Sequence, residues 1–424
     1  MNRVSVGAHQ TDPGKTRLAG SLTRWLTPRR VRTHALLLAV CLWTVYAVDM
    51  SAPGLRDRTG LIKGADFLHF YTLGKLALAN RGDLLYDVGA QSTELARVVP
   101  EAKGYVYVPL YGPQVSLFFA PLALLPYGWA LGAWLVLNLL IYSACCFPIW
   151  KSCANLQNQG WTVLAAAIAF PGFFHLLLWG QTSGLALLCF TLVYLALRRP
   201  HPFLAGLALG CLIFKPQLGL AAAVVFILGG EWWVVGGSII AASAQLGIAW
   251  WHYGSGVMKN YWDALTHMRT VLSPLEPRLY QTDSLRGFWT LLLPWSSASF
   301  IVWGLYFASA LAVVWLLLLC WRNRAPLALR YSALLVASVL VAPHLTVYDL
   351  AILAPAFLLL ADWAISSPED PLADVTRGLL YLCYPLFLLG PVSRLTHVQL
   401  SVPAMAAVLW VIWRASRRGG AVGA

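Results

Sequence analysis

About a dozen apolar runs, most of them close to the length of a membrane-spanning helix, make up the greater part of this chain of 424 residues. The connectors between the runs are short, apart from two longer ones that are rich in charged and aromatic residues. Charged residues make up only 11% of the chain, against roughly 25% in soluble domains. The pattern predicts an all-α polytopic membrane protein and leaves no room for a large soluble domain.

The amino-terminal tail, residues 1–33, is basic and carries seven Arg or Lys residues against one acid, Asp12. The apolar run THALLLAVCLWTVYAV follows, without a small-residue cleavage site after it. We therefore expect an uncleaved first helix with a cytoplasmic amino terminus, in the cytoplasmic (inner) membrane of a bacterium. The net charge of +13 then reflects orientation and contact with anionic membrane lipids, and no nucleic-acid partner is expected.

The arginines predict which connectors face the cytoplasm. All the basic connectors fall on one side of the membrane under two conditions. The segment 109–126, which contains four prolines, must be re-entrant or interfacial, and 203–230 must turn around at Lys215-Pro216. About twelve crossings result, with both termini inside. The basic connectors are 198–199, 322–330, 377 and 414–418. The apolar runs after the first lie near 127–149, 161–178, 182–197, 203–230, 233–251, 298–321, 329–343, 348–365, 376–392 and 399–413.

This topology defines a single transmembrane domain over residues 34–415, followed by a cytoplasmic tail, 416–424. The first outer loop spans 51–112 and is expected to bear interfacial helices, and the second outer loop spans 253–297. Most polar residues of the domain fall in these loops or at helix tips on the same side. We therefore expect the active site on the outer face.

All eight cysteines lie in or beside apolar runs, without a CxxC pair or a His at metal-ligand spacing. We interpret them as small buried hydrophobic residues. No cofactor is expected, and the sequence leaves the use of a divalent metal open, although a lone carboxylate makes a poor metal site.

Asp66, in the segment GADFLHFY of the first outer loop, is the candidate catalytic base. Few other side chains of a chain embedded in a membrane could take up a proton at its edge. Alternatively, Asp66 only caps the helix DFLHFYTLGKLALA, a favoured role of Asp at a helix start. On that helix His69 shares the face of Asp66 and Tyr71 does not, so His69 is the better candidate for orienting the base.

Several segments carry a resemblance to a known family. They are DFLHFYTLGKLALAN with LY (66–86), VPLYGP with LFFAPLALLP (108–126), Gly-Gln (180–181), AGLALG with KPQ (205–217) and PH with YDL (343–350). From about residue 60 to 365 the chain resembles glycosyltransferase family 87. The resemblance implies the C-type membrane glycosyltransferase fold, a polyprenyl-phosphate sugar as donor and Asp66 as the catalytic base.

Four cationic residues are candidates for contact with the donor phosphate: Lys215, Arg286, His344 and Arg394. Lys215 interrupts an apolar stretch, where a charge usually has a functional role, although its side chain could also reach the outer interface. Arg286 could present its planar fork to phosphate, or pair with the nearby Asp283. The resemblance implies that the region of His344 lies near the phosphate, although Leu345-Thr346-Val347 departs from the Trp-rich stretch of some members.

Neutral and acidic residues complete the predicted substrate-binding set. Gln181 and Gln217 offer amides to sugar hydroxyls, or only cap their helices. Tyr71 follows Asp66, and Asp349 follows His344. The full set is His69, Tyr71, Gln181, Lys215, Gln217, Arg286, His344 and Asp349.

We therefore expect a membrane glycosyltransferase that moves a hexose, mannose in the best-known members, to a lipid or glycan acceptor on the outer face. A single base with attack opposite the leaving phosphate would invert the anomeric centre. The alternative is a transporter or flippase, because a helix broken near Lys215-Pro216 is typical of a transporter's substrate site. A non-catalytic scaffold gives no reason for a lysine in an apolar stretch.

Overall fold

The computed structural model describes residues 25–267, 278–295, 299–323 and 325–420, and within these ranges it consists of helices and loops without a strand. Most of the predicted basic tail, 1–33, lies outside the described residues. Parts of the predicted second outer loop, 253–297, and the end of the predicted C-terminal tail, 416–424, lie outside them too.

Five described helices are long and apolar enough to cross a membrane, or seven if each of two bent helix pairs is one span. This confirms an all-α integral membrane protein. The five are α2 (Pro28–Met50), α6 (Tyr127–Ser152), α12 (Trp232–Tyr253), α16 (Ser299–Arg322) and the continuous segment of η8 (Val347–Leu353) with α18 (Ala354–Ser366). The bent pairs are η3 (Ala154–Gln159) and α7 (Gly160–Ile168) with α8 (Pro171–Trp179), and α19 (Pro371–Leu386) with α20 (Gly390–Thr396).

Further helices account for the other apolar runs. They are α9 (Ser183–Arg198), α10 (Pro202–Gly210), α11 (Leu220–Leu228), α17 (Leu327–Val341) and α21 (Ser401–Gly420). The expected break within 203–230 falls at Lys215, which separates η4 (Cys211–Phe214) from η5 (Pro216–Gly219). Each expected run thus forms a helix or a bent pair, and about twelve crossings remains a prediction.

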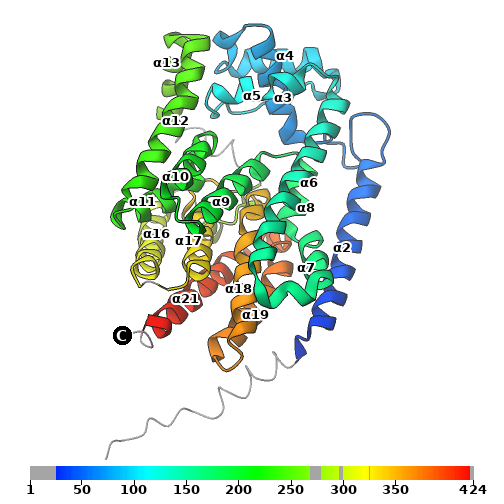
Figure 1. Cartoon of the computed structure of the whole chain (residues 1–424). Helices are drawn as coiled ribbons and strands as arrows, with labels where there is room; N and C mark the ends of the chain where they lie inside the picture. The colour runs from blue at the N-terminus through cyan, green and yellow to red at the C-terminus, as the bar shows by residue number, and fades with distance from the viewer. Residues whose placement is uncertain (1–24, 268–277, 296–298, 324, 421–424) are drawn as a thin grey trace, which may run out of the picture.

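One end of the molecule is built from the first long loop and from α13 (Ser255–Thr266), as Figure 1 shows. The loop contains η1 (Gly82–Leu84), η2 (Pro100–Ala102), α3 (Ala65–Leu78) and α4 (Val88–Val98), and α5 (Gln114–Ala123) follows it. A core of aromatic rings holds α3 against α5, with Phe70 stacked on Phe119 at 5.0 Å between centroids. We refer to this assembly as the loop layer.

The ten residues of α5 make a helix of about 15 Å, roughly half the hydrocarbon thickness of a bilayer. Helix α5 lies against α3 because Gly74 allows a close approach: a Cβ there would come within 2.7 Å of the Phe119 carbonyl oxygen. A re-entrant or interfacial role of 109–126 therefore stays our prediction.

The opposite end of the molecule is basic. It carries the start of α2, the start of α19 and the end of α21, which Figure 1 places away from the loop layer. There Arg418 pairs with Asp370 at 2.7 Å, and Arg377 pairs with Asp374 at 3.1 Å. This distribution agrees with arginines gathered on one membrane side, and we predict that this side is cytoplasmic.

Between the two ends, α17 forms the centre of the packed core. Twelve of its side chains, from Leu329 to Val341, are buried, which leaves the next segment, 342–353, on a rigid support. Helix α8 lies directly against that segment, since a Cβ on Gly172 would meet the Ala351 backbone nitrogen at 2.5 Å. The core therefore fixes η8 relative to the tip that follows α8.

All eight cysteines are free thiols, and five of them are buried. The expectation that all are buried is wrong for Cys41 and Cys211, which are exposed. Cys41 lies on α2, where only Ala35 and Ala39 are buried, so an apolar side chain there faces the surroundings of the bundle.

Candidate functional site

Two glycines bring Asp66 to the tip between α8 and α9. Gly64, the N-cap of α3, and Gly180, after the end of α8, both adopt positive φ, at 64° and 65°. They lie so close that a Cβ on Gly180 would be 3.5 Å from the Gly64 Cα. Only glycine fits easily at both positions, because other residues are strained at positive φ. The residues that follow them, Asp66 and Gln181, are thereby placed side by side.

Asp66 does not cap α3. The N-cap is Gly64, without a side-chain cap bond, and Asp66 lies in the first helical turn. The Gln181 Nε2 amide instead donates to Asp66 Oδ2 at 3.1 Å. Asp66 is partly exposed as a residue, and its carboxylate is held by Gln181 and buried enough for its pKa to rise. The capping alternative therefore does not describe its contacts.

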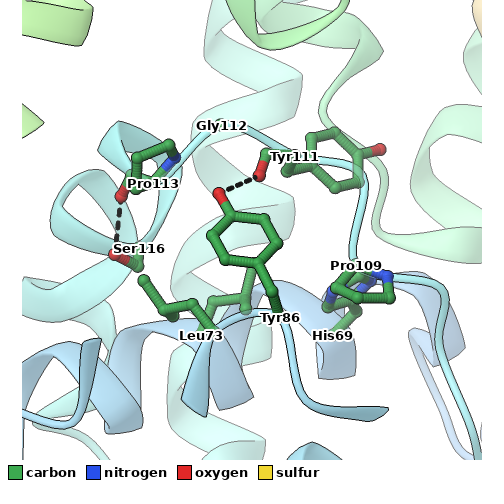
Figure 2. A pocket seen from close by; sticks show the side chains of 9 residues that line it. His69, Leu73, Tyr86, Pro109, Tyr111, Gly112, Pro113 and Ser116 are labelled. Carbon is green, nitrogen blue, oxygen red and sulfur yellow. Dashed lines mark hydrogen bonds between the residues drawn. The ribbon is translucent and has the colours of Figure 1, made fainter. Parts of the chain in front are cut away.

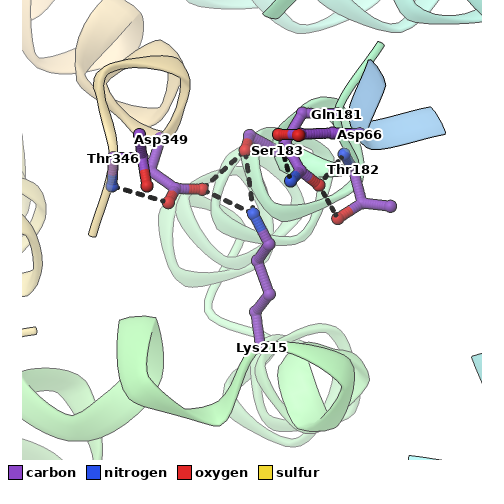
Figure 3. Close-up of polar contacts among 7 residues, drawn as sticks. All are labelled: Asp66, Gln181, Thr182, Ser183, Lys215, Thr346 and Asp349. Atoms are coloured by element: carbon purple, nitrogen blue, oxygen red, sulfur yellow. Dashed lines mark hydrogen bonds and ion pairs between the residues drawn. The ribbon is translucent and has the colours of Figure 1, made fainter. Parts of the chain in front are cut away.

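Lys215 is buried in an ion pair with Asp349, from the start of η8 (Figure 3). Its Nζ lies 2.8 Å from Asp349 Oδ1 and 3.1 Å from Ser183 Oγ, and both charged side chains are 3% exposed. Ser183 Oγ also donates to Asp349 Oδ1 at 2.5 Å, and the other oxygen, Oδ2, accepts from the Thr346 backbone N–H at 3.3 Å. Lys215 thus does not reach outward to an interface, as one alternative held.

The α8–α9 tip connects the two groups. Gln181 bonds Asp66, and two residues later Ser183 bonds Asp349 and Lys215. Thr182 between them donates from both its backbone N–H and its hydroxyl to Gln181 Oε1, at 2.7 and 3.0 Å. These bonds orient the Gln181 amide with its NH₂ toward Asp66 (Figure 3). Helix α3 therefore begins at a polar cluster that four chain segments build. We call it the cluster; its members are Asp66, Gln181, Thr182, Ser183, Lys215, Thr346, Tyr348 and Asp349.

Burial raises the pKa of Asp66 to about 6, which is above the value of an ordinary carboxyl. The positive charge of Lys215 lowers it, as do hydrogen bonds from Gln181 and Tyr348, and the Asp349 carboxylate raises it. A carboxylate with a pKa near 6 is a stronger base than usual and is still largely ionised at neutral pH. The environment of Asp66 suits a general base.

His69 lies among aromatic rings and makes no hydrogen bond to Asp66 among the described residues. Its ring stacks on Tyr107 at 4.8 Å and meets Tyr111 edge-on at 5.7 Å, and its Nε2 is buried without a partner. Burial lowers the pKa of His69 to about 3, so the ring is neutral. Figure 2 shows His69 on a narrow pocket beside Pro109 and Tyr111. A direct orienting bond to the base is not formed in this structure.

Tyr71 contacts the start of α6 and the residues before it, and no residue of the cluster. Its hydroxyl donates to the Leu125 backbone carbonyl at 2.8 Å, and its ring meets Tyr127 edge-on. These contacts tie α3 to the segment between α5 and α6. Tyr71 therefore lies away from the cluster around Asp66, as expected for a residue on another helical face.

Arg286, on α15 (Leu285–Leu292), lies against the segment that carries His344. Arg286 is buried, and its Nε donates to the Pro343 carbonyl, which precedes His344. Asp283 bonds instead to Gln399, at 2.8 Å, and to Ser401. The structure thus joins Arg286 to the segment before η8. Arg394 is exposed on α20.

Gln217 lies in η5, partly exposed, two residues after Lys215. Three residues of the cluster were not singled out from the sequence: Thr182, Ser183 and Tyr348. The Lys215 Nζ lies 5.0 Å from the centre of the Tyr348 ring. Thr182 and Ser183 follow the candidate Gln181, and Tyr348 precedes the candidate Asp349. Including the polar residues within two positions of each candidate would have found all three.

No group of three or more His, Cys, Asp or Glu side chains suited to a metal ion occurs in the described part of the chain. Asp66 and Asp349 are the acids of the cluster, and Asp349 is already engaged by Lys215 and Ser183. If Asp66, Asp349 and Lys215 are all charged, their net charge is negative by one unit. An anionic substrate at this site would therefore need further donors or cations.

The fold and the cluster define an integral membrane protein with a carboxylate, Asp66, held by hydrogen bonds beside the tip between two of its helices. A family model, glycosyltransferase family 87, matches residues 110–343, which is more than half of the chain. The chain belongs to glycosyltransferase family 87 and is a membrane glycosyltransferase.

The matched range includes Gln181, Ser183, Lys215 and Arg286, and it ends just before His344. Asp66 and Asp349 lie outside it, so their place in the site rests on the geometry described above. Comparisons with curated proteins and with solved structures gave no match.

Proposed function

We propose that this glycosyltransferase moves a hexose, mannose as the first candidate, from a polyprenyl-phosphate donor to a hydroxyl of a lipid or glycan acceptor. The site faces the outer side of the membrane, and Asp66 is the general base. The observation that carries this proposal is the Asp66 carboxylate, which Gln181 holds by a hydrogen bond and whose pKa burial raises to about 6. Membership of a glycosyltransferase family favours it over the transporter alternative.

In this reaction Asp66 takes the proton of the acceptor hydroxyl as its oxygen bonds to the anomeric carbon. The bond between that carbon and the phosphate oxygen breaks, and polyprenyl phosphate leaves with the electron pair. Attack from the side opposite the phosphate inverts the configuration, as in inverting sugar hydrolases. One base and groups that stabilise the departing phosphate are sufficient for this chemistry.

The cationic groups divide into two roles in this proposal. Lys215 is neutralised by Asp349 in an ion pair, and its positive charge lowers the pKa of Asp66. The departing phosphate then needs other groups, for which Arg286 and His344 are the candidates on the neighbouring segments. Gln217 and His69 would contact the sugar or the acceptor.

A transfer assay in proteoliposomes tests this function. Radiolabelled mannose is presented on synthetic polyprenyl phosphate with a panel of lipid and glycan acceptors, and product is measured for the wild-type protein. Product formation supports the donor class. If folded protein gives no product with any polyprenyl-phosphate hexose, the proposed donor is wrong, and a flip assay of the same liposomes then tests the transporter alternative.

The rate of transfer is expected to fall as the pH is lowered through about 6, by about tenfold for each pH unit below that value. The sign follows because the base must be ionised and its pKa is raised to about 6. Initial rates between pH 4.5 and 8 measure the inflection. A sugar phosphodiester does not titrate in that range, so the donor does not produce it.

His344→Gln is the control for this profile. If His344 were the titrating group, the inflection near pH 6 would disappear in that variant, whatever its residual rate. An unchanged inflection in His344→Gln agrees with titration of Asp66. A wild-type profile that is flat down to pH 4.5 contradicts the raised pKa of the base.

A further inference from the structure

A second pocket lies at the basic end of the molecule, far from Asp66. It is an open cavity of about 260 Å³ between the start of α2 and the junction where η3 ends and α7 begins. Arg29 and Arg32 line it from α2, Asn158 and Gln159 from the end of η3, and Trp161 from the first turn of α7. The reaction at Asp66 uses none of these residues.

The pocket has an unbalanced positive charge within the described part of the chain. Arg29 and Arg32 are three residues apart on α2, so their side chains share one face of the helix. Both are exposed, and no described acidic side chain forms an ion pair with either. The intervening Arg30 is engaged elsewhere, with the Trp25 carbonyl at 3.1 Å and over the Trp25 ring.

Neutral donors accompany the two arginines. The amides of Asn158 and Gln159 can each donate two hydrogen bonds. The pocket also lies where α2 begins, and the positive end of a helix dipole favours a negative charge, although Thr27 already accepts from the Arg30 N–H there. Guanidinium and amide donors around one small cavity suit a phosphate group.

The position of the pocket favours a lipid as the source of that phosphate. Helix α2 is a candidate span with few buried residues, so most of its surface is available to lipid tails. Trp161, at the rim, is 74% exposed, which is typical of a tryptophan at the level of the headgroups. A phosphate bound here could therefore extend acyl chains along α2 and α7.

We propose that this pocket binds the headgroup phosphate of an anionic phospholipid, held by Arg29 and Arg32 and flanked by Trp161. The site is independent of the transferase chemistry. Basic pockets between helices on the cytoplasmic side are a general means of binding anionic lipids. The bound lipid would hold α2, of which few residues are buried, against the end of η3 and the start of α7.

Native mass spectrometry of the full-length protein, titrated with phosphatidylglycerol or phosphatidylcholine, tests the site. Arg29→Gln/Arg32→Gln is expected to bind phosphatidylglycerol about 10- to 30-fold more weakly than the wild type, because each guanidinium donates directly to the phosphate in this proposal. Binding of phosphatidylcholine is expected to be the same in both proteins.

Arg414→Gln/Arg417→Gln is the matched control. It removes the same charge from the same end, where these arginines lie over the Trp410 and Trp413 rings at 5.4 and 5.3 Å. Its affinity for phosphatidylglycerol is expected to stay within about twofold of the wild type, because surface charge alone acts weakly. Equal losses in the two variants, or no loss in the first, would overturn the proposal.

Inorganic phosphate separates the two sources of the ligand. An excess of it is expected to leave most phosphatidylglycerol bound, because the acyl chains add apolar contacts. Complete displacement would overturn the assignment to a lipid and identify a site for free phosphate. Arg29→Lys/Arg32→Lys, which keeps the charge and loses the planar fork, should bind with intermediate affinity.

Discussion

Replacing Asp66 with Asn is expected to lower the transfer rate by about 10²- to 10⁴-fold, the range that a positioned general base contributes. The amide cannot take up the acceptor proton at neutral pH. It can still accept the hydrogen bond from Gln181 that holds the wild-type carboxylate. Folding should therefore be retained, and the measurement is the initial rate of sugar transfer in proteoliposomes.

Asp83→Asn is the control for this variant. Asp83 lies in the same loop layer, but its side chain is 61% exposed and it pairs with Arg81 at the surface. It should transfer sugar at the wild-type rate. Substantial turnover by Asp66→Asn, from protein with the elution profile and melting temperature of the wild type, would remove Asp66 from the role of base.

Lys215→Met is expected to destabilise the protein by about 3–5 kcal/mol, the usual effect of leaving one member of a buried ion pair without its partner. In the wild type, Lys215 neutralises Asp349 at 2.8 Å, and both side chains are 3% exposed. The substitution leaves a buried carboxylate whose remaining hydrogen bonds, among the described residues, come from Ser183 and the Thr346 backbone N–H. Thermal unfolding in detergent measures the loss.

The paired variant Lys215→Met/Asp349→Asn provides the comparison. It removes both charges and keeps a side-chain oxygen that can accept from Thr346, so most of the lost stability should return. If the pair is as unstable as the single variant, the lysine stabilises the protein by another route, such as its contact with the Tyr348 ring.

The single variant has a second expected effect, on the catalytic base. Lys215 lowers the pKa of Asp66, so its removal should raise that pKa and move the inflection of the pH–rate profile to higher pH. At a fixed pH near 6, less of the base would be ionised and transfer would be slower. An inflection that does not move would show that Lys215 does not act on Asp66.

Individual residues show how far sequence reasoning reached. Gln181 and Asp349 were predicted to bind substrate, and both lie in the cluster. Their hydrogen bonds, however, are made within the protein: Gln181 bonds Asp66, and Asp349 bonds Lys215. Lys215 was expected to meet phosphate, and its nearest partner is a carboxylate. The choice of residues was therefore better than the assignment of roles, because a buried polar group is visible in a sequence and its partner is not.

His69 illustrates the same limit. Asp66 and His69 both lie near the start of α3, yet the His69 ring stacks on Tyr107, from a segment some forty residues away. Helical periodicity predicts which residues are neighbours on one helix. It contains no information on which rings from another segment will cover them.

The sequence by itself determined the class of the protein, the approximate positions of its helices and two conspicuous ionisable side chains, Asp66 in the predicted first outer loop and Lys215 within an apolar stretch. These follow from local physics, since the free energy of placing a residue in a bilayer depends mainly on its own chemistry. Only the tertiary structure decided the partners, Asp66 with Gln181 and Lys215 with Asp349. Those contacts join residues that are 115 and 134 positions apart in the sequence. Contacts over such separations depend on which helices pack together and on where glycines allow a close approach.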